Sequence, residues 1–162
     1  MPIKAIFLDR DGVVNKEVNY LFKKEDFEFI DGIFDACLYF QNLDYVIIIV
    51  TNQSGIARKY YTENDYQTLT KWMLRQFEDN GIEILNVFHC PHGPESTCEC
   101  RKPKPGMLLK SKEDFPEIEF DKSYLIGDSD SDIQAAFSVG IKSFKVSKEY
   151  SLSDWTNEFL LD

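Results

Sequence analysis

The sequence predicts an α/β fold: a three-layer, Rossmann-like parallel sheet flanked by helices. Short apolar segments alternate along the chain with segments of helical periodicity, a pattern typical of parallel sheets. Three of the apolar segments end abruptly at polar side chains, namely Asp9, Thr51 and Asp128. Parallel strands present their carboxyl ends at one edge of the sheet, where ligands bind, so we expect these residues to meet there.

The first expected element is a buried strand over residues 5–8, which is followed by Asp9-Arg10-Asp11-Gly12. Side chains two positions apart in an extended segment point to the same face, so Asp9 and Asp11 can face one point. Their charges repel each other, and a divalent cation such as Mg2+, which prefers carboxylate oxygens, would offset that repulsion. The alternative is a solvated strand end that carries two surface aspartates.

The next segments bring the second polar strand end. Residues 15–29 lack helical periodicity, and we expect a turn and a short hairpin beside the end of the first strand. Asp31 is expected to N-cap a helix over residues 32–41 that buries Cys37. A strand over residues 45–50, apolar on both faces, then ends in the small and polar run from Thr51 to Gly55.

The remaining elements follow from apolar periodicity and from capping or breaking residues. Thr62, with Asp65 three residues later, is expected to cap a long helix. The expected ranges are strands over 84–89, 123–126 and 141–146 and helices over 63–79, 105–114, 130–139 and 152–160.

Composition bounds the class of protein. Hydrophobic residues make up 43% and charged residues 28% of the chain, as in one soluble globular domain over residues 1–162. The formal net charge of −10 argues against nonspecific binding to nucleic acid or to an anionic membrane. No apolar run reaches the ~20 residues of a membrane span, and the N-terminus does not resemble a signal peptide. We expect a cytoplasmic protein, and the absence of a heptad pattern favours a monomer.

A second metal site is predicted by cysteine spacing. Cys90-x-His92 and Cys98-x-Cys100 place four ligands within eleven positions, which suits a tetrahedral structural Zn2+ site. In a reducing compartment such clustering favours metal over disulfides. The alternative is three free thiols beside a histidine. His89 lies outside the spacing and is expected to be structural.

The strand ends suit phosphoryl transfer. Asp9 could attack phosphorus and form an aspartyl-phosphate. Asp11 could protonate the leaving oxygen and then activate water. Thr51 could donate a hydrogen bond to the phosphoryl oxygens, and Lys102 could neutralise their charge.

These segments resemble a known superfamily. Asp9 to Gly12, Thr51 to Gly55, Arg101 to Pro103 and Gly127-Asp128 resemble the four motifs of the haloacid dehalogenase-like phosphatases. More narrowly, residues 27–32, 51–58 and 100–109 resemble the D-glycero-D-manno-heptose 1,7-bisphosphate 7-phosphatases. The resemblance covers about residues 3–146, and the histidinol-phosphate phosphatases are similar.

The resemblance implies a role for each matching residue. Asp9 would be the nucleophile, Asp11 the acid/base, and Thr51 and Lys102 the groups that stabilise the phosphoryl group. The implied Mg2+ ligands are Asp9, Asp128 and the backbone carbonyl of Asp11. The implied substrate contacts are Asn52 and Arg101, which would orient the substrate, and Glu17, Tyr20 and Ser54, which would lie near the sugar. The resemblance also implies zinc at Cys90, His92, Cys98 and Cys100.

The resemblance further implies hydrolysis of the 7-phosphate of a heptose bisphosphate during synthesis of ADP-heptose, lipopolysaccharide or related glycans. The alternatives are a histidinol-phosphate phosphatase or a non-catalytic sugar-phosphate-binding protein. Ser129 departs from the pattern, because some heptose phosphatases carry a lysine there. Asp132 could orient Lys102 or could favour the first turn of a helix through its charge. The spacing leaves no room for a separate cap domain.

Overall fold

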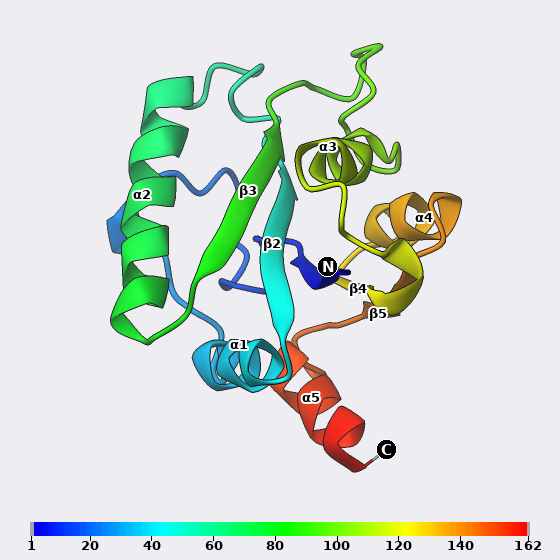
Figure 1. Cartoon of the computed structure of the whole chain (residues 1–162). Coiled ribbons are helices and arrows are strands. Elements are labelled where there is room, and N and C mark those ends of the chain that lie inside the picture. Colours follow the sequence, from blue (N-terminus) through cyan, green and yellow to red (C-terminus); the bar gives the residue numbers. More distant parts are fainter. Residues whose placement is uncertain (1, 162) are drawn as a thin grey trace.

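A computed structural model describes residues 2–161 and contains the expected parallel sheet (Figure 1). The five parallel strands are β1 (Lys4–Leu8), β2 (Tyr45–Asn52), β3 (Ile84–Cys90), β4 (Tyr124–Gly127) and β5 (Lys142–Lys145). Their order in the sheet is β3-β2-β1-β4-β5. The central strand β1 therefore has β2 on one side and β4 on the other, and the three predicted polar strand ends are neighbours.

Helices cover both faces of the sheet and complete three layers (Figure 1). They are α1 (Ile33–Asn42), α2 (Glu63–Asp79), α3 (Gly106–Asp114), α4 (Asp130–Ser138) and α5 (Leu152–Leu161). The helices α1, α2 and α5 pack on one face, and α3 and α4 pack on the other. Two short 3-10 helices, η1 (Lys24–Asp26) and η2 (Phe120–Lys122), lie in the connections. Within residues 2–161 no separate cap domain interrupts this arrangement.

Burial of β1 on both faces explains its unbroken apolar sequence. Ile6 and Leu8 belong to the core beneath α1, α2 and α5, whereas Ala5 and Phe7 belong to the core beneath α3 and α4. Each fully buried large apolar side chain contributes about 1.5–3 kcal/mol. The strand that carries Asp9 is thus held from both sides, and its end is a rigid place for a functional group.

Local capping is predicted correctly at one helix and wrongly at another. Thr62 and Asp65 form the expected capping box at the start of α2. The N-cap of α1 is Gly32, with φ of 85° and no side-chain cap, so the prediction that Asp31 caps this helix is wrong. Gly32 adopts the left-handed backbone conformation that glycine tolerates. Gly32, and not Asp31, therefore occupies the N-cap position. Cys37 is buried as expected.

The segment over residues 15–29 is held by packing more than by a strand ladder. Its backbone pairing consists of isolated bridges, including an antiparallel one between Asn15 and Phe29, so the expected hairpin is reduced to single bridges. Phe27 and Phe29 instead pack against Trp72 of α2, with ring centroids 5.4 and 5.9 Å away. Among the described residues, no helix is both long enough and apolar enough to cross a bilayer.

Candidate active site

The ends of β1, β2 and β4 bring the predicted residues together. Leu8 pairs with Ile49 of β2 and with Ile126 of β4, so the residues that follow these positions lie side by side. The Asp9 amide donates to the Ile126 carbonyl at 3.1 Å, which extends the pairing one residue past β1. Asp9 therefore projects from the middle of the carboxyl edge of the sheet.

Three carboxylates meet at this edge. Asp9, Asp128 and Asp132 each present an oxygen within 4.8 Å of the others. Gly12 allows Asp128 to approach, because a Cβ on Gly12 would lie only 2.0 Å from Oδ2 of Asp128. The φ of Gly12 is +91°, a conformation that also favours glycine. The turn after β1 is thus shaped to admit the carboxylate of Asp128.

Lys102 supplies a buried cation to the same cluster. Its Nζ donates to Asp9 Oδ1 at 3.0 Å, to Asp132 Oδ1 at 2.5 Å and to the Val50 carbonyl at 3.1 Å. The other oxygen of Asp132 accepts from the hydroxyl and backbone amide of Ser129. Both oxygens of Asp132 are therefore engaged within the protein, whereas Asp9 and Asp128 remain the carboxylates suited to an added cation.

The electrostatics of the cluster fit a divalent cation. Burial raises the pKa of Asp9 well above its ordinary value, and nearby Asp132 and Asp128 raise it further against the opposing effect of Lys102. Burial also raises the pKa of Asp128. Burial works to lower the pKa of Lys102, but the charges of Asp9 and Asp132 outweigh it and raise that pKa. One ammonium group does not balance three carboxylates, and carboxylate oxygens are the ligands that Mg2+ prefers.

Asp11 lies beside the acidic cluster and is held by its own set of donors. Its Oδ1 accepts from Arg10 Nη2 at 2.9 Å and from Asn15 Nδ2 at 3.0 Å. Its Oδ2 accepts from Gln53 Nε2 at 3.2 Å. Arg10 is 1% exposed and lies entirely inside the protein. The carboxylate of Asp11 is thus fixed in position while its side chain stays 26% exposed.

The predicted substrate contacts line a cavity beside Asp11. This cavity has a volume of about 220 Å3, and Glu17, Tyr20, Asn52 and Ser54 are among its lining residues. Asn52 also accepts from the backbone amide of Lys102 at 3.1 Å, so it joins β2 to the segment that carries the cation. Arg101 is not among the lining residues, and its Nη1 donates to the His92 carbonyl at 3.3 Å.

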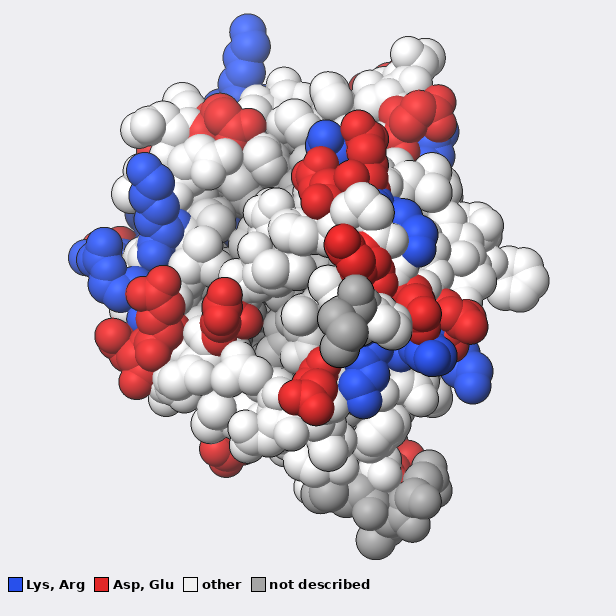
Figure 2. Space-filling model, in the orientation of Figure 1, with Lys and Arg blue, Asp and Glu red and all other residues white. Residues whose placement is uncertain are grey.

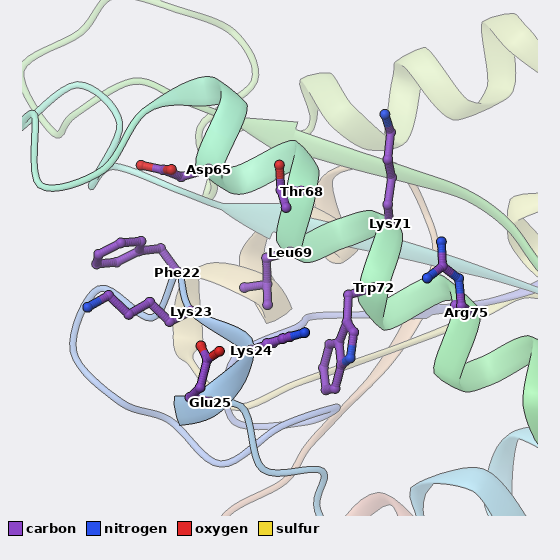
Figure 3. A pocket seen from close by; sticks show the side chains of 10 residues that line it. All are labelled: Phe22, Lys23, Lys24, Glu25, Asp65, Thr68, Leu69, Lys71, Trp72 and Arg75. Atoms are coloured by element: carbon purple, nitrogen blue, oxygen red, sulfur yellow. The ribbon is translucent and has the colours of Figure 1, made fainter.

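A larger cavity of about 600 Å3 lies elsewhere, between residues 22–25 and α2, and contains none of the predicted site residues (Figure 3). In Figure 3 Lys71 and Arg75 point away from the ring of Trp72. On the face shown in Figure 2, acidic and basic side chains are interspersed.

The four predicted zinc ligands also converge. Their donor atoms all lie within 4.8 Å of one another. The Nδ1 of His92 lies 3.4 Å from the Cys90 sulfur and 3.3 Å from the Cys100 sulfur. A structural Zn2+ site has four protein ligands in a tetrahedral arrangement. The three thiol groups and one imidazole supply all four. His89, by contrast, stacks on Tyr66 and pairs with Glu63, which agrees with the structural role expected for it.

Sequence reasoning missed the side chains that connect these groups. Gln53 donates to Asp11 and to Thr51 and accepts from the hydroxyl of Tyr61 at 2.5 Å. Gln53 belongs to the motif from Thr51 to Gly55, so the sequence could have indicated that it lies at the site. The sequence gives no such indication for Tyr61, because its proximity to Gln53 depends on the path of the loop that follows the motif. Asp132 contacts Lys102, as one of its two predicted roles requires.

Comparison with known proteins places this geometry in a family. The family model described as polynucleotide kinase 3 phosphatase matches residues 4–158. The D-glycero-alpha-D-manno-heptose-1,7-bisphosphate 7-phosphatase of Campylobacter jejuni is 48% identical over 98% of this chain and 91% of its own length. The D-glycero-beta-D-manno-heptose-1,7-bisphosphate 7-phosphatase of Vibrio cholerae is 43% identical over 87% of this chain and 79% of its own.

A solved structure agrees with these relatives. The D,D-heptose 1,7-bisphosphate phosphatase from B. bronchiseptica, complexed with magnesium and phosphate, matches with a TM-score of 0.87 and 28% identity. The match covers 98% of this chain and 99% of that one. The convergent strand ends and the Cys/His cluster agree with these similarities. The chain therefore belongs to the haloacid dehalogenase-like D,D-heptose 1,7-bisphosphate phosphatase family.

Proposed function

We propose that this protein is a Mg2+-dependent phosphatase that removes the 7-phosphate of D-glycero-D-manno-heptose 1,7-bisphosphate. The observation that carries the proposal is the meeting of Asp9, Asp128 and Lys102 at the ends of adjacent parallel strands. The substrate is taken from the relatives, which are named for this reaction and match nearly the whole chain. The product would feed ADP-heptose synthesis for lipopolysaccharide or related glycans.

The proposed cation site uses two of the three clustered carboxylates. Asp9 and Asp128, with the backbone carbonyl of Asp11, would hold Mg2+, and Asp132 would remain with Lys102. The bound ion would supply positive charge between the anionic nucleophile and the anionic phosphoryl group. Lys102 supplies a second positive charge from the protein side, and its contact with Asp9 keeps that charge next to the nucleophile.

The reaction proceeds in two steps. A carboxylate oxygen of Asp9 forms a bond to phosphorus as the bond from phosphorus to the sugar oxygen breaks, and Asp11 gives its proton to that oxygen. The resulting aspartyl-phosphate is then attacked by water, which loses a proton to Asp11, and inorganic phosphate leaves as Asp9 is restored. Thr51 donates its hydroxyl proton to the phosphoryl oxygens throughout.

The sugar is proposed to occupy the cavity beside Asp11. Glu17, Tyr20, Asn52 and Ser54 line it and offer both donors and acceptors for sugar hydroxyl groups. Arg101 directly follows residues 90–100, which we call the zinc loop, and would orient the substrate from there. With no separate cap domain in the described residues, specificity would depend on these few side chains.

Zinc is proposed to serve the reaction indirectly. Cys90, His92, Cys98 and Cys100 would bind one Zn2+ ion, and Arg101 and Lys102 follow the last ligand without a spacer. A loop closed by metal would hold both cations near the phosphate. Lys104 adds to the order of this segment, because its Nζ donates to the Cys98 carbonyl at 2.7 Å.

The proposal is tested by turnover on a panel that contains both anomers of the heptose bisphosphate and histidinol phosphate. We expect kcat/KM for at least one heptose anomer to exceed that for histidinol phosphate by at least about tenfold, or ~1.4 kcal/mol of transition-state stabilisation. Asp9→Asn should abolish phosphate release in the same assay. Faster hydrolysis of histidinol phosphate would reverse the substrate assignment, and release that survives Asp9→Asn would exclude Asp9 as the nucleophile.

A further inference from the structure

We infer that Gln53 and Tyr61 are positioning residues that hold the carboxylate of Asp11 where it can transfer a proton to the leaving oxygen. The inference rests on the proposed function, in which Asp11 is the general acid. It concerns two residues without a role in the reaction described above, and the hydrogen bonds and packing of the turn after β2 carry it.

Gln53 spans the distance between two strand ends. Its backbone amide donates to the Cys90 carbonyl at 2.8 Å, which anchors the turn after β2 to β3. Its side chain is 3% exposed, and Nε2 donates to Asp11 Oδ2 at 3.2 Å and to Thr51 Oγ1 at 2.9 Å. An amide nitrogen has two protons, and both are used here. Gln53 therefore ties the acid that follows β1 to the hydroxyl at the end of β2.

Tyr61 supports the orientation of the Gln53 amide. Its hydroxyl donates to Oε1 of Gln53 at 2.5 Å, which leaves the nitrogen end to donate to Asp11 and Thr51. With the amide reversed, its carbonyl oxygen would face Asp11, and the two groups could form a hydrogen bond only while Asp11 is protonated. The hydroxyl of Tyr61 thus acts on Asp11 through one intervening side chain.

The ring of Tyr61 is itself fixed by packing. It is 5% exposed and stacks on Phe22 with ring centroids 5.4 Å apart and an interplanar angle of 13°. A Cβ on Gly55 would lie 2.2 Å from Cε1 of Tyr61, so the ring occupies the space that this glycine leaves free. A side chain with so little freedom can impose an orientation on its hydrogen-bond partner.

The same contacts direct the hydroxyl of Thr51. Because Gln53 donates to the oxygen of Thr51, the proton of Thr51 must point away from Gln53. In this structure the Thr51 hydroxyl donates to the Asn52 carbonyl at 3.4 Å, and it would turn from this long hydrogen bond to a phosphoryl oxygen. Thr51 keeps the Asn52 carbonyl as a partner when Gln53 is lost, so the loss of the Gln53 amide should affect mainly Asp11 and the protonation of the leaving oxygen.

The test compares leaving groups in Gln53→Leu, Tyr61→Phe, Asp11→Asn and the wild type. The substrates are heptose 1,7-bisphosphate, whose alkoxide is a poor leaving group, and 4-nitrophenyl phosphate, whose phenolate leaves without much need of a proton. The value of kcat/KM reports formation of the aspartyl-phosphate, the step in which the leaving oxygen is protonated. Tyr45→Phe, at the opposite end of β2, is the matched control for loss of a tyrosine hydroxyl.

We expect Gln53→Leu to lower kcat/KM for the sugar phosphate by at least about tenfold, within the range that a positioned general acid contributes, and Tyr61→Phe to lower it less. Both should change kcat/KM for 4-nitrophenyl phosphate by no more than about threefold, with Asp11→Asn showing the same pattern more strongly. Tyr45→Phe should change neither. A merely structural role would lower kcat/KM for both substrates together. A direct sugar contact, which the place of both residues in the lining of the sugar cavity would allow, would instead raise KM for the sugar phosphate and leave kcat unchanged, and that result would overturn the inference.

Equal losses on the two substrates in both Gln53→Leu and Tyr61→Phe, with discrimination retained in Asp11→Asn, would overturn the inference and leave the proposed function intact. Equal losses in Asp11→Asn would remove the acid assignment and this inference together. Failure of the wild type to hydrolyse heptose bisphosphate would appear before any variant is compared and would reject the proposed function itself.

Discussion

At the scale of single residues, Gly12 shapes the site because its lack of a side chain leaves room for the carboxylate of Asp128. Replacing it with alanine would place a methyl group 2.0 Å from the Asp128 carboxylate, which would have to move. We expect Gly12→Ala to lower kcat by about 100-fold, because a displacement near 1 Å in a reacting group has that effect. Steady-state kinetics with saturating Mg2+ measures the loss.

Gly140 offers a matched control for backbone strain. Its φ of +79° is close to the +91° of Gly12, but a Cβ on Gly140 would meet nothing within 4 Å. Gly140→Ala should therefore cost stability, by about 1 kcal/mol, while leaving kcat near the wild-type value. Equal kinetic losses in the two variants would show that strain, and not displacement of Asp128, is responsible.

Cys37 allows a prediction about stability at alkaline pH. Burial raises the pKa of this thiol from 9.0 to about 12, so it stays neutral in the folded state at pH values where the unfolded chain ionises. A pKa raised on folding gives stability that is complete below the unfolded value and is lost as pH rises toward the folded value. The contribution of Cys37 should therefore decline above pH 9.

The measurement compares the free energy of unfolding of the wild type and Cys37→Ala by denaturant titration at pH 8, 9 and 10. The stability advantage of the wild type should shrink by about 1.4 kcal/mol between pH 8 and pH 10, one pKa unit of differential ionisation. Other groups that titrate in this range are common to both proteins and cancel. A constant difference across the range would mean that the thiol of Cys37 is ionisable in the folded state.

At the scale of elements, the sequence was sufficient for the sheet and its helices but not for several connections. The apolar runs that became β1 and β2 are buried on both faces, so period and composition identified them directly. The segment over residues 15–29 was harder, because Phe27 and Phe29 pack against α2, which is distant in sequence. The same limit explains why Asp9 and Asp128 were found from strand ends while Tyr61 was not.

Among the elements, the zinc loop should give the most informative result when its metal is removed. The backbone amide of Gly106, at the start of α3, donates to the Glu99 carbonyl at 2.9 Å, and a Cβ on Gly106 would lie 2.1 Å from that oxygen. The loop is thus packed closely against the segment that carries Arg101 and Lys102. If its order depends on zinc, loss of the ion should disturb those cations and leave the strands in place.

We expect Cys98→Ser to lose most of its zinc and to lower kcat/KM by at least about tenfold with Mg2+ supplied, since a misplaced cation weakens transition-state stabilisation. Elemental analysis gives the zinc content, and far-ultraviolet circular dichroism should remain close to that of the wild type. Cys37→Ala is the matched cysteine control and should keep one zinc ion per chain. Full turnover by zinc-free protein would contradict the indirect role of zinc.

At the scale of the whole molecule, the site gathers negative charge in a protein that already has a net charge of −10. Asp9, Asp128 and Asp132 share one buried ammonium, from Lys102, and the unbalanced negative charge opposes folding. The charge arrangement proposed to bind Mg2+ therefore lowers stability at the carboxyl edge of the sheet. Because the proposed carboxylate ligands Asp9 and Asp128 follow β1 and β4, an ion bound at this point would link the ends of these two strands.

This conflict predicts opposite effects of Asp128→Asn with and without Mg2+. Burial and the charge of Asp132 raise the pKa of Asp128, so the neutral amide should leave the Mg2+-free protein with a melting temperature no lower than that of the wild type. Mg2+ at a hundred times its Kd should stabilise the wild type by about 2.7 kcal/mol, or roughly 5–10 °C, because it binds only the folded state. The variant should gain much less.

Thermal melts of zinc-replete protein dialysed free of Mg2+ and then titrated with it make the comparison. Asp130→Asn, which changes an exposed carboxylate two residues away, is the control. Equal stabilisation of wild type and Asp128→Asn would mean that the ion binds elsewhere, because an ion held between the ends of β1 and β4 cannot be indifferent to one of its two carboxylate ligands.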